Sequence, residues 1–400
     1  MAVESSRREF LPFALPTIGE VEIKEVVDSL ESGWISTGPK VREFEGAIAD
    51  YVGADHAVAV SSCTAGLHLS LQAFGVRPGD EVIVPTMTFC STANVVEHLG
   101  ARPVLVDVGT DFNVSADTIR AAITDRTKAV VPVHFGGQAV DLDSIYRLAL
   151  EHDLAVVEDA AHAIDTSYGE HRIGASAAQA AFPGLRRAVV YSFYATKNLT
   201  TAEGGMVVTT DEDLAAEIRM MSMHGMSRDA WKRYTSAGSW YYEVVAPGFK
   251  ANMTDLQAAL GLHQLARLPE FTATRQALAA RFDEAFADVP ELEPPIRHTG
   301  RDHVFHLYVI RLDLDRLRID RSAFIDQLRE VQIGTSVHFI PVHQHPYYAE
   351  TYGYAPDDLP VAASLFEQII SLPLYPRLTT ADIDRVAEAV IDIIDRNRVS

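Results

Sequence analysis

One stretch of the chain decides its fold class: Ala188-Val-Val-Tyr-Ser-Phe-Tyr-Ala-Thr-Lys197-Asn-Leu-Thr-Thr-Ala-Glu-Gly-Gly-Met-Val-Val-Thr209. Two short apolar runs flank a polar segment that contains one lysine. Continuous apolar runs of this length are typical of strands buried on both faces of a sheet. Desolvation after the first strand would lower the pKa of the lysine and let its amine condense with a carbonyl group. A lysine after a strand is also commonly a solvated surface group, so its neighbours must decide between the two interpretations.

Similar apolar runs recur along the chain and alternate with helical segments. The predicted strands are Ala57–Val60, Glu81–Val84, Arg102–Asp107, Ala129–Val133, Ala155–Glu158, Ala188–Ser192 and Met206–Thr209. The helical segments between them include Ala65–Ala73 and Asp143–Leu150. Strands that alternate with helices predict an α/β domain with a largely parallel sheet, and such sheets bind ligands beyond the carboxyl ends of their strands.

A second, smaller region is predicted toward the C-terminus. A long helix at about Asp255–Asp288, with Pro269 inside it, leads into this region. The pattern there predicts strands at His303–Arg311 and Thr335–Ile340 and helices at Arg321–Val331 and Thr380–Arg396. We therefore expect a large domain over residues 1–275, which includes an N-terminal segment at 1–50, and a small α+β domain over residues 276–400.

Composition and charge exclude several classes of protein. The 400 residues are 48% apolar and 22% charged, which is typical of a soluble globular protein. The net charge of −21 opposes binding to nucleic acid or to an anionic membrane surface. Only two cysteines are present, and no run approaches the about 18 apolar residues of a membrane span. With no apolar signal segment at the N-terminus, we expect a cytoplasmic protein without nucleic-acid or membrane partners.

Several polar or aromatic residues follow other predicted strands. The run Ser61-Ser-Cys-Thr-Ala-Gly66 opens a helix, so it suits a phosphate, although an ordinary helix cap would look the same. Asp159 ends a buried strand and needs a partner, either a pyridinium N–H or the N–H groups of the next turn. Phe89 could stack on an aromatic ring or pack in the core, and the Ser192 hydroxyl could reach the same phosphate. His162, taken alone, is better explained as a structural histidine than as a ligand contact.

These features together match the groups of a single cofactor. A phosphate cradle, an aromatic face, a buried acid and a lysine correspond to the phosphate, ring face, ring nitrogen and aldehyde of pyridoxal phosphate. The sequence therefore predicts that this cofactor binds at the carboxyl edge of the sheet.

With these motifs the chain resembles the sugar aminotransferases of the DegT/DnrJ/EryC1/StrS family, which have the aspartate-aminotransferase fold, known as PLP-dependent transferase fold type I. The resemblance spans about residues 10–395. Its motifs are Gly33-Trp-Ile-Ser-Thr-Gly-Pro39, Ser61-Ser-Cys-Thr-Ala-Gly-Leu67, Glu158-Asp-Ala-Ala-His-Ala163, Ser192 to Gly205, Gly248-Phe-Lys-Ala-Asn-Met-Thr-Asp-Leu-Gln257 and His338-Phe-Ile-Pro-Val-His343. Two departures are Cys63, where the family commonly has glycine, and Ala251, where it commonly has an aromatic residue.

The resemblance implies a role for each matching residue. Lys197 would form a Schiff base with the cofactor and carry protons, Asp159 would hold the protonated ring nitrogen, and His162 would lie near the ring hydroxyl. The other cofactor-binding residues of the same subunit would be Ser62, Cys63, Thr64, Ala65, Phe89 and Ser192. Asn252 would reach the phosphate from a second subunit, which implies a homodimer with shared active sites. Substrate would contact Trp34, Lys250 and His343.

The resemblance also implies a reaction. The chain has Lys250 together with Asn252, and it has histidine at 162 where glutamine is common. This pattern resembles the branch of the family that aminates C4 of 4-keto-6-deoxy or 4-keto-pentose nucleotide sugars. L-Glutamate would donate its amino group and leave pyridoxamine phosphate, and a dTDP- or UDP-linked keto sugar would then accept it, in ping-pong order. Antibiotics and cell-surface polysaccharides both contain such amino sugars.

The nucleotide diphosphate needs donors on an acidic protein. The candidates are Arg233, Lys250, Arg301 and His303. Residues 226–247 contain several large aromatic side chains and would form either a loop over the substrate or a dimer contact; these are Trp231, Tyr234, Trp240, Tyr241 and Tyr242.

Three other functions stay open at this point: a C3-aminating enzyme, a sugar dehydratase of the same fold, and a non-catalytic regulatory protein. Dehydratases of this fold carry histidine in place of Lys197, so the lysine disfavours the dehydratase function. The complete set of predicted cofactor-binding residues and the net charge of −21 disfavour a regulatory protein.

Overall fold

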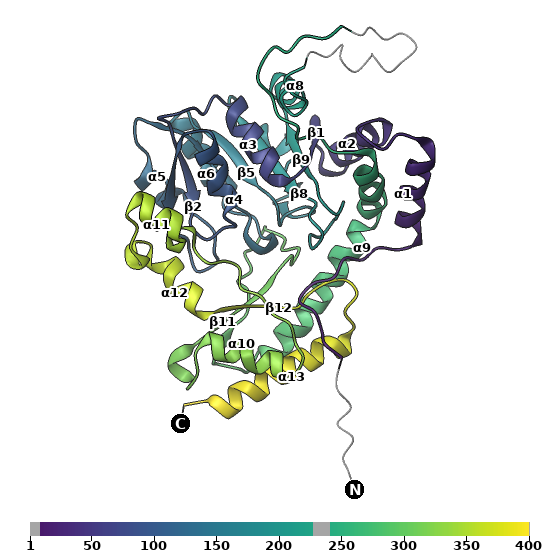
Figure 1. The fold of residues 1–400 in the computed structure, drawn as a ribbon. Coiled ribbons are helices and arrows are strands. Elements are labelled where there is room, and N and C mark those ends of the chain that lie inside the picture. Colours follow the sequence, from purple (N-terminus) through teal and green to yellow (C-terminus); the bar gives the residue numbers. More distant parts are fainter. Residues whose placement is uncertain (1–8, 227–240, 400) are drawn as a thin grey trace.

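The computed structural model describes residues 9–226 and 241–399, and a seven-stranded sheet lies at its centre (Figure 1). The strands are β1 (His56–Val60), β2 (Glu81–Pro85), β3 (Arg102–Val106), β4 (Thr127–Val130), β5 (Ala155–Asp159), β8 (Arg187–Ser192) and β9 (Gly205–Thr209), in the spatial order β1-β9-β8-β5-β4-β2-β3. Only β9 runs against the others, because it pairs antiparallel with both β1 and β8. The predicted α/β architecture with a largely parallel sheet is confirmed.

Helices cover both faces of this sheet, and the alternation of strand side chains explains why. Ile83 packs in the core on one face, whereas its neighbours Val82 and Val84 pack on the other. On the second face lie α3 (Cys63–Ala73), α4 (Ser91–His98) and α8 (Glu212–Met221). On the first lie α2 (Pro39–Val52), α5 (Ala116–Ala122), α6 (Leu142–Glu151) and the N-terminal half of α9 (Asp255–Phe286).

The long helix α9 joins the sheet to the C-terminal part of the molecule (Figure 1). It starts at a capping box in which Thr254 and Gln257 satisfy each other's backbone N–H groups. The helix continues through Pro269, although proline lacks the N–H for one helical hydrogen bond. Leu268 packs against the large sheet, and Phe282 packs in the core of the C-terminal part.

The C-terminal part contains a three-stranded antiparallel sheet. Its elements are β10 (Leu292–Glu293), β11 (Tyr308–Leu312), β12 (Ile369–Leu372), α10 (Arg321–Glu330) and α13 (Thr380–Asn397). Leu11, from the N-terminal segment, joins its core, whereas Val342 and Tyr348 pack with the large sheet. The boundary at residue 275 stays a prediction, since it falls inside α9 and the chain crosses between the two parts several times.

Further α-helices and strands complete the described structure. They are α1 (Glu20–Ser32), α7 (Ser176–Gln179), α11 (Pro346–Tyr352), α12 (Pro360–Gln368) and the two-stranded sheet of β6 (Ser167–Tyr168) and β7 (His171–Arg172). In the described part of the chain, no helix has the length and apolar character of a membrane span.

One predicted strand is wrong. Residues 335–340 form no strand, and Ser336 alone makes a bridge, to Ser371 of β12. The apolar alternation of this segment has another physical cause, because His338 and Phe339 line a cavity between the two parts of the molecule. The strand predicted from His303 is also shorter than expected and begins at Tyr308.

Candidate active site

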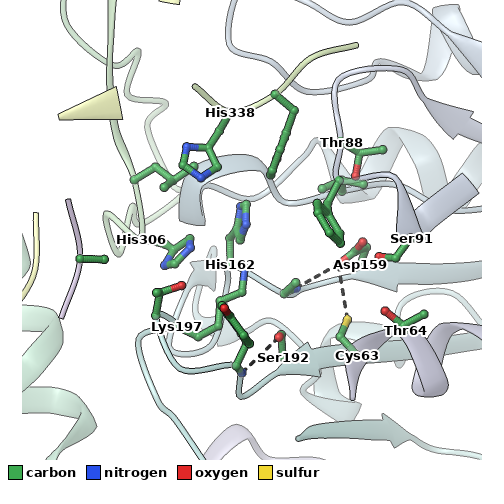
Figure 2. Close-up of a pocket in the computed structure, with 18 of the residues that line it drawn as sticks. Cys63, Thr64, Thr88, Ser91, Asp159, His162, Ser192, Lys197, His306 and His338 are labelled. Atoms are coloured by element: carbon green, nitrogen blue, oxygen red, sulfur yellow. Dashed lines mark hydrogen bonds between the residues drawn. The ribbon is translucent and has the colours of Figure 1, made fainter. Parts of the chain in front are cut away.

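The carboxyl ends of β1, β2, β5 and β8 meet at one edge of the large sheet, because these strands all run in the same direction. A cavity of about 480 Å³ opens at this edge, and residues of the C-terminal part form its opposite wall. Figure 2 shows Cys63, Thr64 and Asp159 on one side of the cavity and three histidines on the other. The strand-end residues predicted from the sequence therefore lie around one space.

The residues predicted to cradle a phosphate lie at the start of α3. Ser62, Cys63 and Thr64 line the cavity, and the Ser62 hydroxyl accepts the backbone N–H of Ala65 at 3.1 Å. Ala65 itself does not line the cavity. A Cβ at Gly205 would come within 2.6 Å of the Ser62 carbonyl carbon, so only glycine lets β9 begin this close to the cradle. Ser192, at the end of β8, lines the cavity beside it.

Asp159 ends β5 in the floor of this cavity, and its side chain is 4% exposed. The backbone N–H of Ala161 donates to Oδ1 at 3.1 Å, and the Thr92 hydroxyl donates to Oδ2 at 2.8 Å. Among the residues that the structure describes, no cationic side chain forms an ion pair with it. A buried carboxylate requires such a partner, and a protonated pyridine nitrogen would supply one.

Lys197 lies in the turn after β8, and its side chain faces the cavity. Burial lowers the pKa of Lys197 from 10.5 to about 8, although Cys63 and Asp159 act in the opposite direction. A useful fraction of the amine is therefore unprotonated near neutral pH. The cradle, the unpaired acid and this amine together fit pyridoxal phosphate.

His162 lines the cavity between Asp159 and the histidines of the opposite wall (Figure 2). Its Nδ1 accepts the backbone N–H of Gly136 at 3.2 Å, and its ring stacks on Phe339 with centroids 5.9 Å apart. Burial, reinforced by Lys197 and His338, holds the pKa of His162 well below its ordinary value. The ring is therefore neutral, with its proton on Nε2, which can donate to a ligand in the cavity.

Two further histidines, His306 and His338, line the cavity, and the sequence analysis did not select either of them. The side-chain N–H of Asn198 donates to the Val304 carbonyl, which fixes the orientation of the amide. The amide oxygen, Oδ1, lies 3.1 Å from His306 Nδ1 and must therefore accept a proton from that nitrogen. His338 Nδ1 lies 2.8 Å from the Ser371 hydroxyl. Burial lowers the pKa of His338 to about 4 and that of His306 well below its ordinary value. No local pattern marks His306, because it lies in a segment predicted as an ordinary strand.

The cavity is poor in positive charge. Lys197 is the only lysine or arginine among the described residues that line it, and the three histidines are neutral. Glu203 lies at its edge. Anionic ligands must therefore find their counter-charges elsewhere.

Several predicted contacts lie outside this cavity. Phe89 lines it as expected, but Trp34, Lys250 and Asn252 do not. The Asn252 amide donates to the Thr37 hydroxyl, and the Lys250 ammonium lies 3.9 Å from the Met223 sulfur.

The candidate donors for the nucleotide diphosphate are also elsewhere. Arg301 pairs with Asp141 at 3.6 Å, and the ring of His303 stacks on Phe305 with centroids 4.0 Å apart. Tyr241 and Tyr242 are exposed, and four other predicted contacts lie outside the described residues: Trp231, Arg233, Tyr234 and Trp240.

The structure corrects the prediction for His343. This side chain is fully buried behind β2, with Nδ1 at 2.7 Å from the Thr86 hydroxyl and Nε2 at 3.0 Å from the Pro356 carbonyl. Both ring nitrogens are therefore occupied within the protein. His338, five residues earlier in the same motif, reaches the cavity instead.

Comparison with known proteins gives consistent matches. A model of the DegT/DnrJ/EryC1/StrS aminotransferase family matches residues 16–391. The spore coat polysaccharide biosynthesis protein SpsC of Bacillus subtilis is 53% identical over 97% of this chain and 98% of its own length.

Solved structures give the same result. The putative sugar aminotransferase Spr1654 of Streptococcus pneumoniae, in its PMP form, superposes with a TM-score of 0.88 at 34% identity, over 96% of this chain and 99% of that one. It was also solved in a PLP form. DesI, solved in the presence of its TDP-sugar product, gives a TM-score of 0.84 at 32% identity, over 97% of this chain and 94% of that one.

Proposed function

The chain belongs to the DegT/DnrJ/EryC1/StrS aminotransferase family, and from this premise we propose that it transfers the amino group of L-glutamate to C4 of a nucleotide-linked 4-keto-6-deoxy sugar. It is a PLP-dependent nucleotide-sugar aminotransferase with fold type I. The observation that carries the proposal is a single cavity that holds Lys197, Asp159 and the cradle at Ser62–Thr64.

Each of these cavity residues has a separate role in the proposed reaction. When bound, pyridoxal phosphate supplies an aldehyde that takes up an amino group and a protonated ring that draws electrons from the reacting carbon. Lys197 Nζ would take the proton from the α-carbon of the amino donor and deliver it to the carbon that carried the aldehyde of the cofactor. Asp159 would hold the proton on the ring nitrogen, and His162 Nε2 would donate to the ring hydroxyl. The hydroxyl groups of Thr64 and Ser192 hold the phosphate.

Neutral histidines on the opposite wall support a sugar as the second substrate. His306 and His338 present uncharged imidazoles to the cavity, and these can exchange hydrogen bonds with sugar hydroxyls without attracting a carboxylate. The DesI structure was solved with a TDP-sugar product, and SpsC is named for polysaccharide biosynthesis. We propose a similar nucleotide sugar here, destined for a cell-surface polysaccharide.

The shortage of positive charge supports a homodimer with shared active sites. Glutamate, the cofactor phosphate and a nucleotide diphosphate all need cations, whereas only Lys197 supplies one within the described cavity. We propose that Lys250 and Asn252 of a second copy complete the site, since neither reaches the cavity of its own chain.

Helix α1 lies at the edge of the molecule (Figure 1), and we propose that it contacts that second copy. Its inner side is polar, because the fully buried Glu22 pairs with Arg267 of α9 at 2.9 Å. Its outer side is apolar, with an exposed stripe at helical spacing that consists of Ile23, Val27, Leu30 and, beyond the helix end, Trp34. A helix whose apolar side faces outward indicates a protein contact at that side.

The substrate is tested by product analysis. The enzyme is incubated with L-glutamate and a panel of dTDP- and UDP-linked 3-keto and 4-keto sugars, and the aminated carbon is assigned by NMR. We expect an amino group at C4 and one 2-oxoglutarate for each amino sugar. Amination at C3, or a deoxygenated product, would refute the proposed position or reaction.

A further inference from the structure

Thr92 lies directly behind Asp159, in the first turn of α4, and is completely buried. Its Oγ1 is 2.8 Å from Oδ2 of Asp159 and 2.9 Å from Oγ1 of Thr88. A carboxylate only accepts hydrogen bonds, so Thr92 must donate to Asp159 and accept from Thr88. The order of the protons along this chain of groups is therefore determined. Thr88 lines the cavity, whereas Thr92 does not.

The second carboxylate oxygen is held independently. Oδ1 of Asp159 accepts the backbone N–H of Ala161 at 3.1 Å, and the Cys63 sulfur lies 3.8 Å away. Burial, reinforced by Asp159, raises the pKa of the Cys63 thiol well above its ordinary value, so the thiol keeps its proton and can donate weakly. Each oxygen thus has a donor within the protein and keeps lone pairs for a ligand in the cavity.

We propose that Thr92 is a positioning residue for the transamination. Its hydroxyl, which Thr88 orients, fixes the plane of the Asp159 carboxylate so that the remaining lone pairs face the ring nitrogen of the cofactor. Thr92 touches neither cofactor nor substrate and acts through Asp159. The inference rests on the proposed role of Asp159, and it holds whichever keto sugar the enzyme accepts.

Thr92→Val tests this in the holoenzyme, because valine keeps the shape of threonine and removes the hydroxyl. Since a hydrogen bond to a charged group is at stake, we expect about tenfold weaker retention of pyridoxal phosphate and about tenfold lower kcat, with little change in KM for glutamate. We also expect the pH midpoint of the visible absorbance of the bound cofactor to rise. A less firmly held ring proton leaves less positive charge near the Lys197 nitrogen, which then keeps its own proton to higher pH.

Two matched variants separate the hydrogen bond from packing. Thr92→Ser keeps the hydroxyl and should restore the absorbance midpoint and the cofactor affinity. Thr272→Val makes the same change at a buried threonine of α9 whose hydroxyl has no partner among the described residues, and it should leave both unchanged.

The outcomes also separate this inference from the role of Asp159. If Asp159→Ala leaves the absorbance midpoint unchanged, the role of Asp159 itself is wrong. If Asp159→Ala shifts the midpoint but Thr92→Val does not, or if Thr92→Ser is as impaired as Thr92→Val, only the role of Thr92 is refuted.

Discussion

Lys197 occupies an environment that changes its chemistry. Its side chain lies in a cavity, and desolvation outweighs the attraction of Cys63 and Asp159 to give a pKa of about 8. An exposed lysine, by contrast, titrates at about 10.4. This amine is therefore available as a nucleophile and a base at pH values where surface lysines are ammonium ions.

Replacing Lys197 should abolish covalent attachment of the cofactor. We expect Lys197→Ala to bind pyridoxal phosphate without a borohydride-reducible linkage and to lose about 10²–10⁴-fold in kcat, because a positioned acid–base group contributes about that much. Lys128→Ala, at an exposed position of β4, should keep both properties. A reducible linkage that survives in Lys197→Ala would show that another lysine carries the reaction.

The lowered pKa of Lys197 predicts a pH dependence for cofactor capture. Only the neutral amine attacks an aldehyde, so the rate at which cofactor-free enzyme captures pyridoxal phosphate should rise with pH, with its midpoint near pH 8, and then level off. Stopped-flow absorbance from pH 6 to 10 measures this rate. A midpoint near that of an exposed lysine would contradict the desolvated environment. The model compound aminocaproate should give the unshifted profile as a control.

At the scale of elements, β5 and β8 carry a buried ion pair next to the active site. Arg187 Nε donates to Glu158 at 2.6 Å, and His134 Nε2 lies 3.0 Å from the other carboxylate oxygen. Burial alone would raise the pKa of the Glu158 carboxyl, but Arg187 and His134 outweigh it and lower the pKa to about 2. Glu158 immediately precedes Asp159, so this pair anchors the end of the strand that places Asp159 in the cavity.

Breaking this pair should destabilise the fold. We expect Arg187→Met to lower the free energy of unfolding by about 3–5 kcal/mol, because it leaves a buried carboxylate without its cation. Arg186→Met is the matched control, since Arg186 pairs with the exposed Asp153 and should contribute about 0–1 kcal/mol. Urea denaturation followed by circular dichroism measures both.

The stabilisation from this pair has a defined pH window. Because the pKa of Glu158 falls from 4.5 to about 2 on folding, its contribution is complete above the unfolded value and is lost as pH falls from about 4.5 to 2. If Arg187→Met and Arg186→Met lower the free energy of unfolding equally at pH 7, the prediction that the buried pair stabilises the fold is refuted.

At the scale of the whole molecule, the proposed shared active site predicts complementation between two inactive variants. Lys197→Ala and Asn252→Ala should each be inactive or strongly impaired. A random mixture should recover about a quarter of wild-type activity, since half of the dimers are mixed and each mixed dimer has one complete site. Co-refolding at equal concentrations, followed by a transamination assay, tests this.

The mixing experiment needs evidence that the subunits associate. Analytical ultracentrifugation should show a dimer of this 43.9 kDa chain. Substitution of Leu30, in the exposed stripe of α1, by glutamate should shift the species toward the monomer. A dimer without recovery of activity would show that Asn252 does not serve the partner's site.

Local sequence patterns were sufficient for most of the large domain. The strands around residues 57, 81, 102, 129, 155, 188 and 206 appear within a few residues of their predicted bounds, because continuous apolar runs between helices have few alternatives. The segment at 335–340 was also predicted as a strand but forms none, because its side chains line the cavity wall and contact Ser371 instead.

The sequence by itself determined the cofactor chemistry, because lysine, aspartate and the small-residue cradle each follow a strand whose end can be recognised locally. Only the tertiary structure decided which other residues share the cavity. His306 meets Asn198 across 108 positions, and Thr92 meets Asp159 across 67. Such contacts depend on strand order and on how the C-terminal part packs against the sheet. For this reason His338 lines the cavity and His343 does not, although both belong to the same motif.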